Sequence, residues 1–250
     1  MFAPEDLSDD AFLDGRLHLW QPRRGYRAAT DPVLLAAAIS ARTGQTVLDL
    51  GCGAGAAALC LGIRVPGLVI SGLEVQADYA ELARRNAARN GLMLEVIEGD
   101  LAQMPAALQR GFDQVMANPP YYAEQGSTSS DAGRNLALRG DVALWVEVAA
   151  RRLNPGGWAT LILGADRLPE ALCACAGRLG SAMVLPLAAR EGRAASRVIL
   201  RARKGGRAGF RLLAPLILHD GAMHPGDREN HSALAQAVLR GGGDLLAQFR

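Results

Sequence analysis

The sequence has 250 residues, of which 50% are hydrophobic, and its formal net charge at pH 7 is +2. This length is enough for one well-buried domain, with room for a small appendage. The nearly balanced charge excludes a uniformly basic surface, so any nucleic-acid site has to be a local patch. Because Lys204 is the only lysine, the arginine-rich composition is itself weak evidence for RNA binding.

Several other protein classes are also excluded. The start of the chain, "MFAPEDLSDD", is acidic and lacks the apolar segment of a signal peptide. No apolar run approaches the length of a membrane-spanning helix. Zinc or redox motifs are not formed by the four cysteines, Cys52, Cys60, Cys173 and Cys175. We therefore expect a cytoplasmic protein with free buried thiols, no metal and no membrane partner.

An extension of about 45 residues precedes the first buried strand. Residues 1–10 look frayed, and residues 12–22 form a plausible short hairpin around Asp14-Gly15. Residues 30–42, "TDPVLLAAAISAR", predict a helix in which Asp31 is the cap and Pro32 occupies the first turn. We assign residues 1–45 to an N-terminal extension of one hairpin and one helix.

From residue 46 onward, short apolar runs alternate with helical patterns. This alternation predicts an α/β fold with a mostly parallel sheet covered on both faces. Two final strands with no helix between them predict an antiparallel hairpin at one edge. We therefore expect a seven-stranded Rossmann-like core over residues 46–204, followed by a tail, 205–250, that is packed or partly flexible. The expected strands are 46–50, 68–74, 94–100, 112–120, 158–164, 182–188 and 196–204, and the expected helices are 56–64, 76–91, 141–157 and 166–179.

The motif "LDLGCGAG", residues 48–55, lies where the first strand turns into a helix. Its glycines, Gly51, Gly53 and Gly55, allow close approach of a ligand to the backbone, and the helix start offers unpaired N–H groups. Asp49, Glu74 and Asp100 fall near the carboxyl ends of three successive strands. Open α/β sheets bind their ligands at this edge.

The arrangement of acids favours one nucleoside cofactor over another. A carboxylate such as Glu74 can accept hydrogen bonds from both ribose hydroxyls, and Asp100 could receive an adenine amino group. Asp49 would repel a dinucleotide pyrophosphate but suits an ammonium group, so S-adenosyl-L-methionine fits better than a dinucleotide. A glycine-rich turn without any ligand is the alternative interpretation.

The stretch "VMANPPYY", residues 115–122, follows the fourth strand and therefore reaches the same crevice. Asn118 and Pro119 offer a side-chain and a backbone carbonyl, and Pro119 and Pro120 fix the geometry of the turn. Two converging acceptors suit a planar NH2 group, whose lone pair they localise toward a methyl donor. Tyr121 can stack on a flipped base, while Tyr122 is expected to line the loop.

Taken together, "LDLGCGAG", Glu74, Asp100 and "NPPYY" resemble class I S-adenosylmethionine-dependent methyltransferases that modify amino nitrogens. Upstream, "GYRAATDPVLLAAAI" and "FLDGRLHLWQP" resemble the bacterial tRNA(Val) adenine-N6 methyltransferases. That resemblance implies methylation of adenine 37, beside the anticodon. It also implies that Thr30 and Asp31 lie near the methionine end of the cofactor and Arg27 near the substrate entrance. Plain helix capping is the alternative role for Thr30 and Asp31.

A basic segment, residues 190–211, provides a candidate RNA surface. Arg197, Arg201 and Arg203 fall at alternate positions of one strand and share a face that could track phosphates. The alternative is an edge strand that its charges keep soluble. In the serine-rich loop region, Arg134 and Arg139 are the obvious phosphate partners.

Four functions remain open on the residues alone. The leading one is an RNA adenine-N6 methyltransferase acting on tRNA. A protein glutamine N5-methyltransferase would present a similar NH2 group, although such enzymes usually carry a longer helical N-terminal domain. A guanine-N2 rRNA methyltransferase also modifies an amino nitrogen. An RNA-binding scaffold with a relic cofactor fold is the non-enzymatic alternative.

Overall fold

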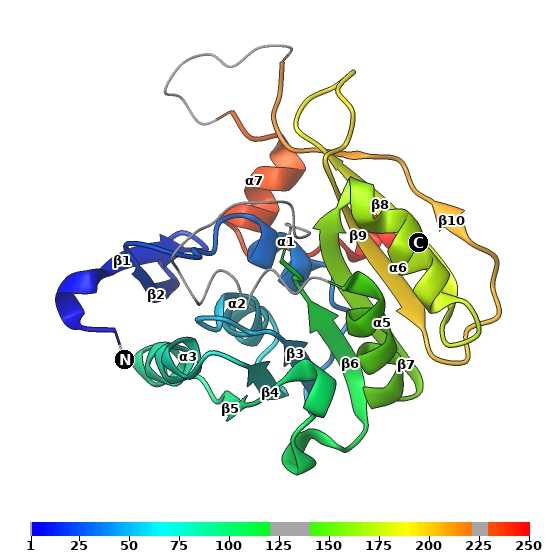
Figure 1. Ribbon diagram of the computed structural model, residues 1–250. Coiled ribbons are helices and arrows are strands. Elements are labelled where there is room, and N and C mark those ends of the chain that lie inside the picture. The colour runs from blue at the N-terminus through cyan, green and yellow to red at the C-terminus, as the bar shows by residue number, and fades with distance from the viewer. Residues whose placement is uncertain (1, 121–140, 222–229) are drawn as a thin grey trace, which may run out of the picture.

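The computed structural model describes residues 2–120, 141–221 and 230–250, which fold around one twisted nine-stranded sheet (Figure 1). The strand order is β10-β8-β9-β7-β6-β3-β4-β5, and β11 also pairs with β8. The strands of this sheet are β3 (Thr46–Leu50), β4 (Val69–Glu74), β5 (Glu95–Glu98), β6 (Phe112–Ala117), β7 (Leu153–Gly164), β8 (Gly180–Ala188), β9 (Arg197–Arg203), β10 (Arg211–Leu212) and β11 (Leu216–Ile217).

The sheet confirms the predicted α/β fold. The five strands from β5 to β7 are parallel, and β9 runs antiparallel to both β7 and β8. The hairpin of β8 and β9 is therefore confirmed. The edge is built differently from the expectation, because β10 and β11 from the tail add parallel pairs beyond β8. Strand β9 is an interior strand, because it lies between β7 and β8.

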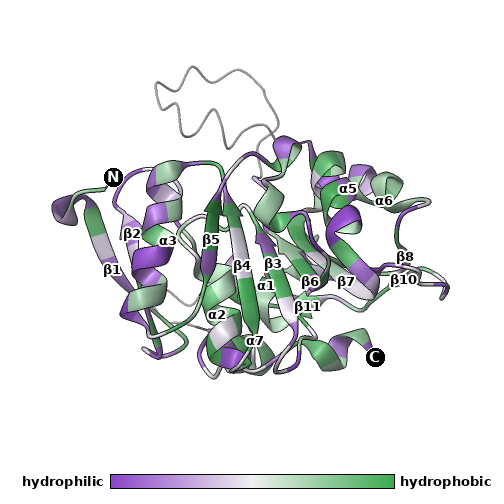
Figure 2. Cartoon of the chain, turned by 90° about the horizontal axis from the view of Figure 1, so that it is seen from below, coloured by the Kyte–Doolittle hydropathy of each residue, from purple (hydrophilic) through white to green (hydrophobic). Residues whose placement is uncertain are grey.

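Helices cover both faces of the sheet, as the alternating pattern predicts. On one face, α1 (Asp31–Ala37), α2 (Ala56–Arg64) and α7 (Ala233–Leu239) enclose one apolar core. On the other, α5 (Val142–Arg152) and α6 (Leu168–Cys175) lie side by side over a second core (Figure 1). Helix α3 (Ala77–Arg89) packs beside β4 and β5, and its hydrophilic and hydrophobic segments alternate in Figure 2.

The N-terminal hairpin consists of β1 (Leu7–Phe12) and β2 (Leu17–Pro22), which pair antiparallel. The predicted turn is confirmed, because Asp14 and Gly15 both adopt positive φ angles, 57° and 79°. The expectation that residues 1–10 fray is wrong from residue 4 onward, where η1 (Pro4–Asp6) precedes β1. Ion pairs with Arg89 and Arg27 hold Asp9 and Asp10, so tertiary contacts order an acidic segment that looks disordered by composition.

Several predicted boundaries shift by a few residues. Helix α1 ends at Ala37 rather than at residue 42, and its cap is Thr30 rather than Asp31. Strand β6 ends at Ala117, so Asn118 stands just beyond the sheet. The segment at residues 154–157, "NPGG", was expected to end a helix but lies within β7, where a register shift accommodates it. The remaining short 3-10 helices are η2 (Leu101–Gln103), η3 (Ala106–Leu108), η4 (Ala165–Arg167) and η5 (Leu246–Phe249).

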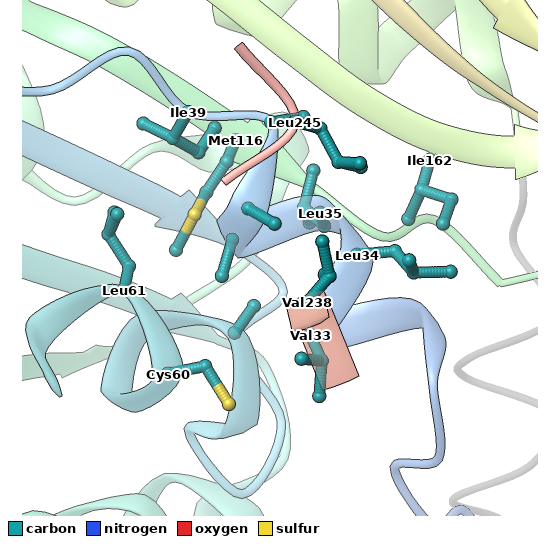
Figure 3. Packing of buried hydrophobic residues seen from close by; sticks show 14 of the residues in the cluster. Val33, Leu34, Leu35, Ile39, Cys60, Leu61, Met116, Ile162, Val238 and Leu245 are labelled. Atoms are coloured by element: carbon teal, nitrogen blue, oxygen red, sulfur yellow. The ribbon is translucent and has the colours of Figure 1, made fainter. Parts of the chain in front are cut away.

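The described part of the tail completes the first apolar core. Val238 of α7 and Leu245 pack with Leu34 and Leu35 of α1, next to β6 and β7 (Figure 3). The Leu245 N–H donates to the Ala37 carbonyl at 2.8 Å. The tail therefore contributes buried side chains as well as the strands β10 and β11.

All four cysteines are free thiols. Cys52, Cys60 and Cys175 are buried, as expected, but Cys173 is exposed on the outer side of α6. Among the residues that the structure describes, no helix combines the length and apolarity that crossing a membrane would demand.

Candidate active site

The carboxyl ends of β3, β4 and β6 bring the candidate site residues together in register. Leu50 of β3 pairs with Leu73 of β4 on one side and with Ala117 of β6 on the other. The residues that follow each of these, Gly51, Glu74 and Asn118, therefore stand next to one another at one edge of the sheet. This is the crevice in which open α/β sheets bind ligands.

The glycine-rich turn wraps tightly from β3 into α2. Gly51, Gly53 and Gly55 adopt φ angles of 65°, 54° and 88°, a region that side chains other than glycine rarely occupy. A Cβ on Gly51 would also lie 2.5 Å from Cη2 of Trp145 on α5. Backbone conformation and crowding together require glycine at this position.

Asp49 is a buried carboxyl group beneath the turn, only 2% exposed. Its Oδ2 has no hydrogen-bond partner among the described residues. Burial, and to a smaller extent the nearby Glu74 carboxylate, raises the pKa of Asp49 to about 8, although a backbone hydrogen bond from Ala58 opposes the shift. An unpaired buried acceptor of this kind fits a cationic ligand group.

Glu74 supports the same turn from β4. Its Oε2 accepts the Gly53 N–H at 2.9 Å, and its Oε1 accepts the Gln76 N–H at 2.9 Å. Burial raises the pKa of this carboxyl group, while those backbone donors act in the opposite direction. Each carboxylate oxygen keeps further acceptor capacity, so Glu74 can still receive hydroxyl donors from a ligand.

A pocket opens between the glycine turn and the segment that precedes α1. Asn118 lines it, together with Tyr26. The Asn118 Nδ2 donates to the Tyr26 Oη at 3.1 Å, whereas the Asn118 Oδ1 is buried and has no partner among the described residues. The other lining residues are Gln21, Ala28, Pro32, Asp49, Gly51, Cys52, Ala54, Ala56 and Ala57.

A protein-family model matches more than half of the chain. The matched residues include the glycine turn, Glu74 at the end of β4 and Asn118 after β6. Residues 29–169 match the model of the methyltransferase small domain. The chain belongs to this methyltransferase family. It is a class I enzyme of the kind that uses S-adenosyl-L-methionine.

Two curated relatives and one solved structure illustrate this methyltransferase's neighbours. It is 31% identical to a tRNA1(Val) (adenine(37)-N6)-methyltransferase of Actinobacillus succinogenes over 76% of this chain and 82% of that one. It is 35% identical to a release factor glutamine methyltransferase of Geobacter sulfurreducens, over only 47% of this chain and 45% of that one. The crystal structure of a predicted O-methyltransferase, Atu636 from Agrobacterium tumefaciens, is 26% identical. The structural alignment covers 85% of this chain and 97% of the Atu636 chain, with a TM-score of 0.69.

The residues of this methyltransferase fit its cofactor. The unpaired Asp49 Oδ2 suits the ammonium group, and Glu74 at the end of β4 suits the ribose hydroxyls. Asp100 is less settled, because it is exposed and its Oδ1 accepts the Ala102 N–H at 2.8 Å. It still lies just beyond β5, on the same edge of the sheet as Glu74.

Thr30 and Asp31 do not line the pocket of the methyltransferase, although their neighbours Ala28 and Pro32 do. Thr30 caps α1 without a side-chain hydrogen bond. The carboxylate of Asp31 forms an ion pair with Arg197 of β9. Asp31, expected near the cofactor, and Arg197, expected on the RNA surface, thus pair with each other and connect α1 to the sheet.

The prediction that Arg197, Arg201 and Arg203 form an RNA-binding row is wrong for Arg201, which is buried. Arg197 pairs with Asp31 instead. Arg201 is 4% exposed, donates to the Ser40 Oγ at 2.7 Å and lies over the ring of Trp158. Burial lowers its pKa to about 10. Only Arg203 of the three is an exposed residue. Because β9 is interior, the edge-strand alternative is wrong as well.

Arg27 lies beside the pocket, in the exposed segment after β2. Its guanidinium donates to the Asp10 carboxylate at 2.7 Å and to the Pro22 carbonyl at 2.9 Å, so it braces the hairpin. Tyr121, Tyr122, Arg134 and Arg139 lie outside the described residues. Pro119 and Pro120 follow Asn118 at the end of the described segment.

Sequence reasoning missed two residues that line the pocket, Tyr26 and Gln21, and one that supports its surroundings, Asn86. The side-chain amide of Gln21 binds both backbone groups of Ala28. Its Oε1 accepts the Ala28 N–H at 2.7 Å, and its Nε2 donates to the Ala28 carbonyl at 3.1 Å. Asn86 of α3 is fully buried and donates to the carbonyls of Trp20 and Ala54, both at 3.0 Å. A buried amide inside an amphipathic helix is a signal that could have revealed Asn86, because such a group needs partners.

Proposed function

We propose that this methyltransferase transfers a methyl group to the exocyclic N6 of an adenine in tRNA, with adenine 37 of a tRNA(Val)-type anticodon loop as the favoured target. The observation that carries the proposal is the buried Asn118 Oδ1, which faces the pocket beside Asp49 without a partner among the described residues. A buried acceptor left unpaired is costly, and a substrate NH2 group would satisfy it.

For methyl transfer, the protein has to position the substrate amino group and polarise its nitrogen. The cofactor supplies a methyl group on a positively charged sulfur. The Asn118 Oδ1 and the Pro119 carbonyl accept the two hydrogens of the substrate amino group. These bonds localise the nitrogen lone pair, which in free adenine is delocalised into the ring. Once the nitrogen carries the methyl group, one of its hydrogens becomes acidic and leaves to solvent, so no strong base is needed.

The assigned roles of the other residues are part of the proposal. Asp49 holds the ammonium group of the cofactor, Glu74 its ribose hydroxyls and Asp100 its adenine amino group. Tyr121 is proposed to stack on the flipped base, and Tyr122 to line the same loop. The adenine must leave its stack to enter the pocket, which costs least in a loop.

The extent of the similarity favours adenine over a glutamine amide. The adenine-N6 relative matches along 76% of this chain, whereas the glutamine relative matches along 47%. The hairpin and the segment to α1 supply Gln21, Tyr26 and Ala28 to the pocket. The longer match therefore supports an adenine-N6 substrate over a glutamine amide.

Nucleoside mass spectrometry of tRNA from a strain that lacks the gene tests the proposal. We expect the loss of N6-methyladenosine from tRNA(Val), and its recovery when the purified protein and S-adenosyl-L-methionine are added. An anticodon stem-loop with guanine at position 37 is the matched control and should accept no methyl group. Loss of N2-methylguanosine from rRNA, or of a methylated glutamine from a protein, would refute the adenine assignment.

A further inference from the structure

The amide of Asn118 makes one specific hydrogen bond that sequence reasoning did not foresee. Its Nδ2 donates to the hydroxyl of Tyr26, 92 residues earlier in the chain, at 3.1 Å. Its Oδ1 is buried in the pocket and has no partner among the described residues. The nitrogen end of the amide is therefore held, and the oxygen end is left to a ligand.

This orientation decides whether Asn118 can serve an amino group. A substrate NH2 brings hydrogens, which only the amide oxygen can accept, because the amide nitrogen is itself a donor. Rotation of the amide by half a turn would exchange the two ends with almost no change in shape. Packing alone cannot select between the two orientations, so a hydrogen-bond partner has to do so.

Tyr26 is well placed for that role because its own backbone is fixed. The Tyr79 hydroxyl donates to the Tyr26 carbonyl at 3.0 Å. Gly25, with a φ of 97°, makes the turn into this position, and a Cβ on it would lie 3.2 Å from the Tyr79 Oη. Tyr79 is itself buried and packs edge-on against Phe2. A rigid backbone thus presents the Tyr26 hydroxyl at a constant place.

The hydroxyl of Tyr26 is available as a hydrogen-bond acceptor. Tyr26 as a residue is half exposed, but its hydroxyl is held by the Asn118 Nδ2 beside the pocket. Burial raises the pKa of Tyr26 to about 12, so the phenol stays protonated at neutral pH. A protonated phenol oxygen keeps a lone pair, with which it accepts the Asn118 Nδ2–H.

We propose that Tyr26 is a positioning residue, which holds the Asn118 amide so that its oxygen, and not its nitrogen, faces the substrate amino group. The inference rests on the proposed role of Asn118 as an acceptor, and it adds a specificity element from the segment between β2 and α1. Tyr26 acts through Asn118 and transfers no proton itself.

The first test is Tyr26→Phe, which keeps the ring and removes only the hydroxyl. At saturating RNA and S-adenosyl-L-methionine we expect kcat to fall about tenfold, the effect of one lost hydrogen bond. The dissociation constant for the cofactor should stay within about twofold, because Asp49 and Glu74 are untouched. A Tyr26→Phe variant with the kcat of the wild type would overturn the proposal.

The second test separates orientation from packing. In Asn118→Asp both ends of the side chain accept hydrogen bonds, so there is no orientation to select. Tyr26→Phe should therefore change the single-turnover rate by less than about twofold in the Asn118→Asp background. A tenfold loss in that background would assign Tyr26 a structural role and refute positioning.

A third measurement does not depend on turnover. In protein labelled with ¹⁵N-asparagine, hydrogen exchange of the Asn118 side-chain NH2 should be slow in the wild type and at least about tenfold faster in Tyr26→Phe. Its signal is assigned by its disappearance in Asn118→Asp. Equal exchange in the two proteins would overturn the positioning role. If the wild type methylates no adenine but shows the exchange difference, the proposed function fails while the positioning of Asn118 stands.

Discussion

The raised pKa of Asp49 predicts that cofactor binding releases a proton, which can be measured. This pKa, raised by burial to about 8, leaves Asp49 about 97% protonated at pH 6.5 in the free protein. An ammonium group placed beside the carboxylate favours its charged form and lowers its pKa. Cofactor binding should therefore release the proton of Asp49 into the buffer.

The number of protons released depends on the Asp49 carboxyl group and on the α-amino group of the cofactor. Asp49 gives up nearly one proton. The cofactor's α-amino group has a pKa of about 7.7–8.0 when free, so at pH 6.5 it takes up less than about 0.1 proton on binding. We expect a net release of about 0.9 proton for each molecule bound. Titration calorimetry in two buffers with different ionisation enthalpies measures this number directly.

The matched control is Asp49→Asn, which keeps the shape and removes the titrating group. Burial also raises the pKa of Glu74, so the variant is needed to separate the two carboxyl groups. Its proton release should fall to near zero, with weaker binding. A binding enthalpy independent of the buffer in the wild type, or an equal release in Asp49→Asn, would refute the reasoning.

The same raised pKa sets the sign of a stability change. The folded protein holds the Asp49 proton up to about pH 8, whereas the unfolded chain loses it near the ordinary value of 3.8. Without cofactor, the free energy of unfolding should therefore fall as pH rises through this window. The linkage limits the fall over the whole window to about 6 kcal/mol. Urea denaturation at pH 5 and pH 8 should show it for the wild type and not for Asp49→Asn.

Three further outcomes follow from the structure. Asn118→Ala should abolish methyl transfer while cofactor affinity, measured by calorimetry, stays nearly unchanged, so full activity would contradict its assigned role. Glu74→Ala should weaken cofactor binding about tenfold or more, because it loses two charge-assisted hydrogen bonds to the ribose. Leu245→Ala should cost about 2–5 kcal/mol in urea denaturation, since this residue is fully buried against α1, and a cost below about 1 kcal/mol would argue that the tail does not stabilise the core.

The core of the fold could be predicted because its signals are local. Each of the five parallel strands overlaps a strand expected from the sequence, and the boundaries of β3 and α2 agree with the expected residue ranges. The positions of Gly51, Glu74 and Asn118 follow from the same signals, since Glu74 ends a strand and the other two come directly after one. Parallel strands that end in register bring such residues together without further information.

The fate of the arginines could not be predicted, because it depends on partners that are distant in sequence. Arg197 meets Asp31 across 166 residues, and Arg201 meets Ser40 across 161. Alternation along β9 gave their shared face correctly but not what covers that face. The tail residue Phe249 does so in part, with its ring 4.7 Å from the guanidinium carbon of Arg201.

Tyr26 shows why the substrate side of the site is harder to foresee than the cofactor side. The cofactor residues lie on β3 and β4 and in the turns after them, where strand order alone sets their neighbours. The orientation of Asn118 depends instead on the loop that follows the hairpin, and Asn86 ties that hairpin, at Trp20, to the glycine turn, at Ala54. Changes in the hairpin can therefore alter how the amide faces a substrate while Asp49 and Glu74 remain in place. Specificity for the amino group and affinity for the cofactor should accordingly respond to different substitutions.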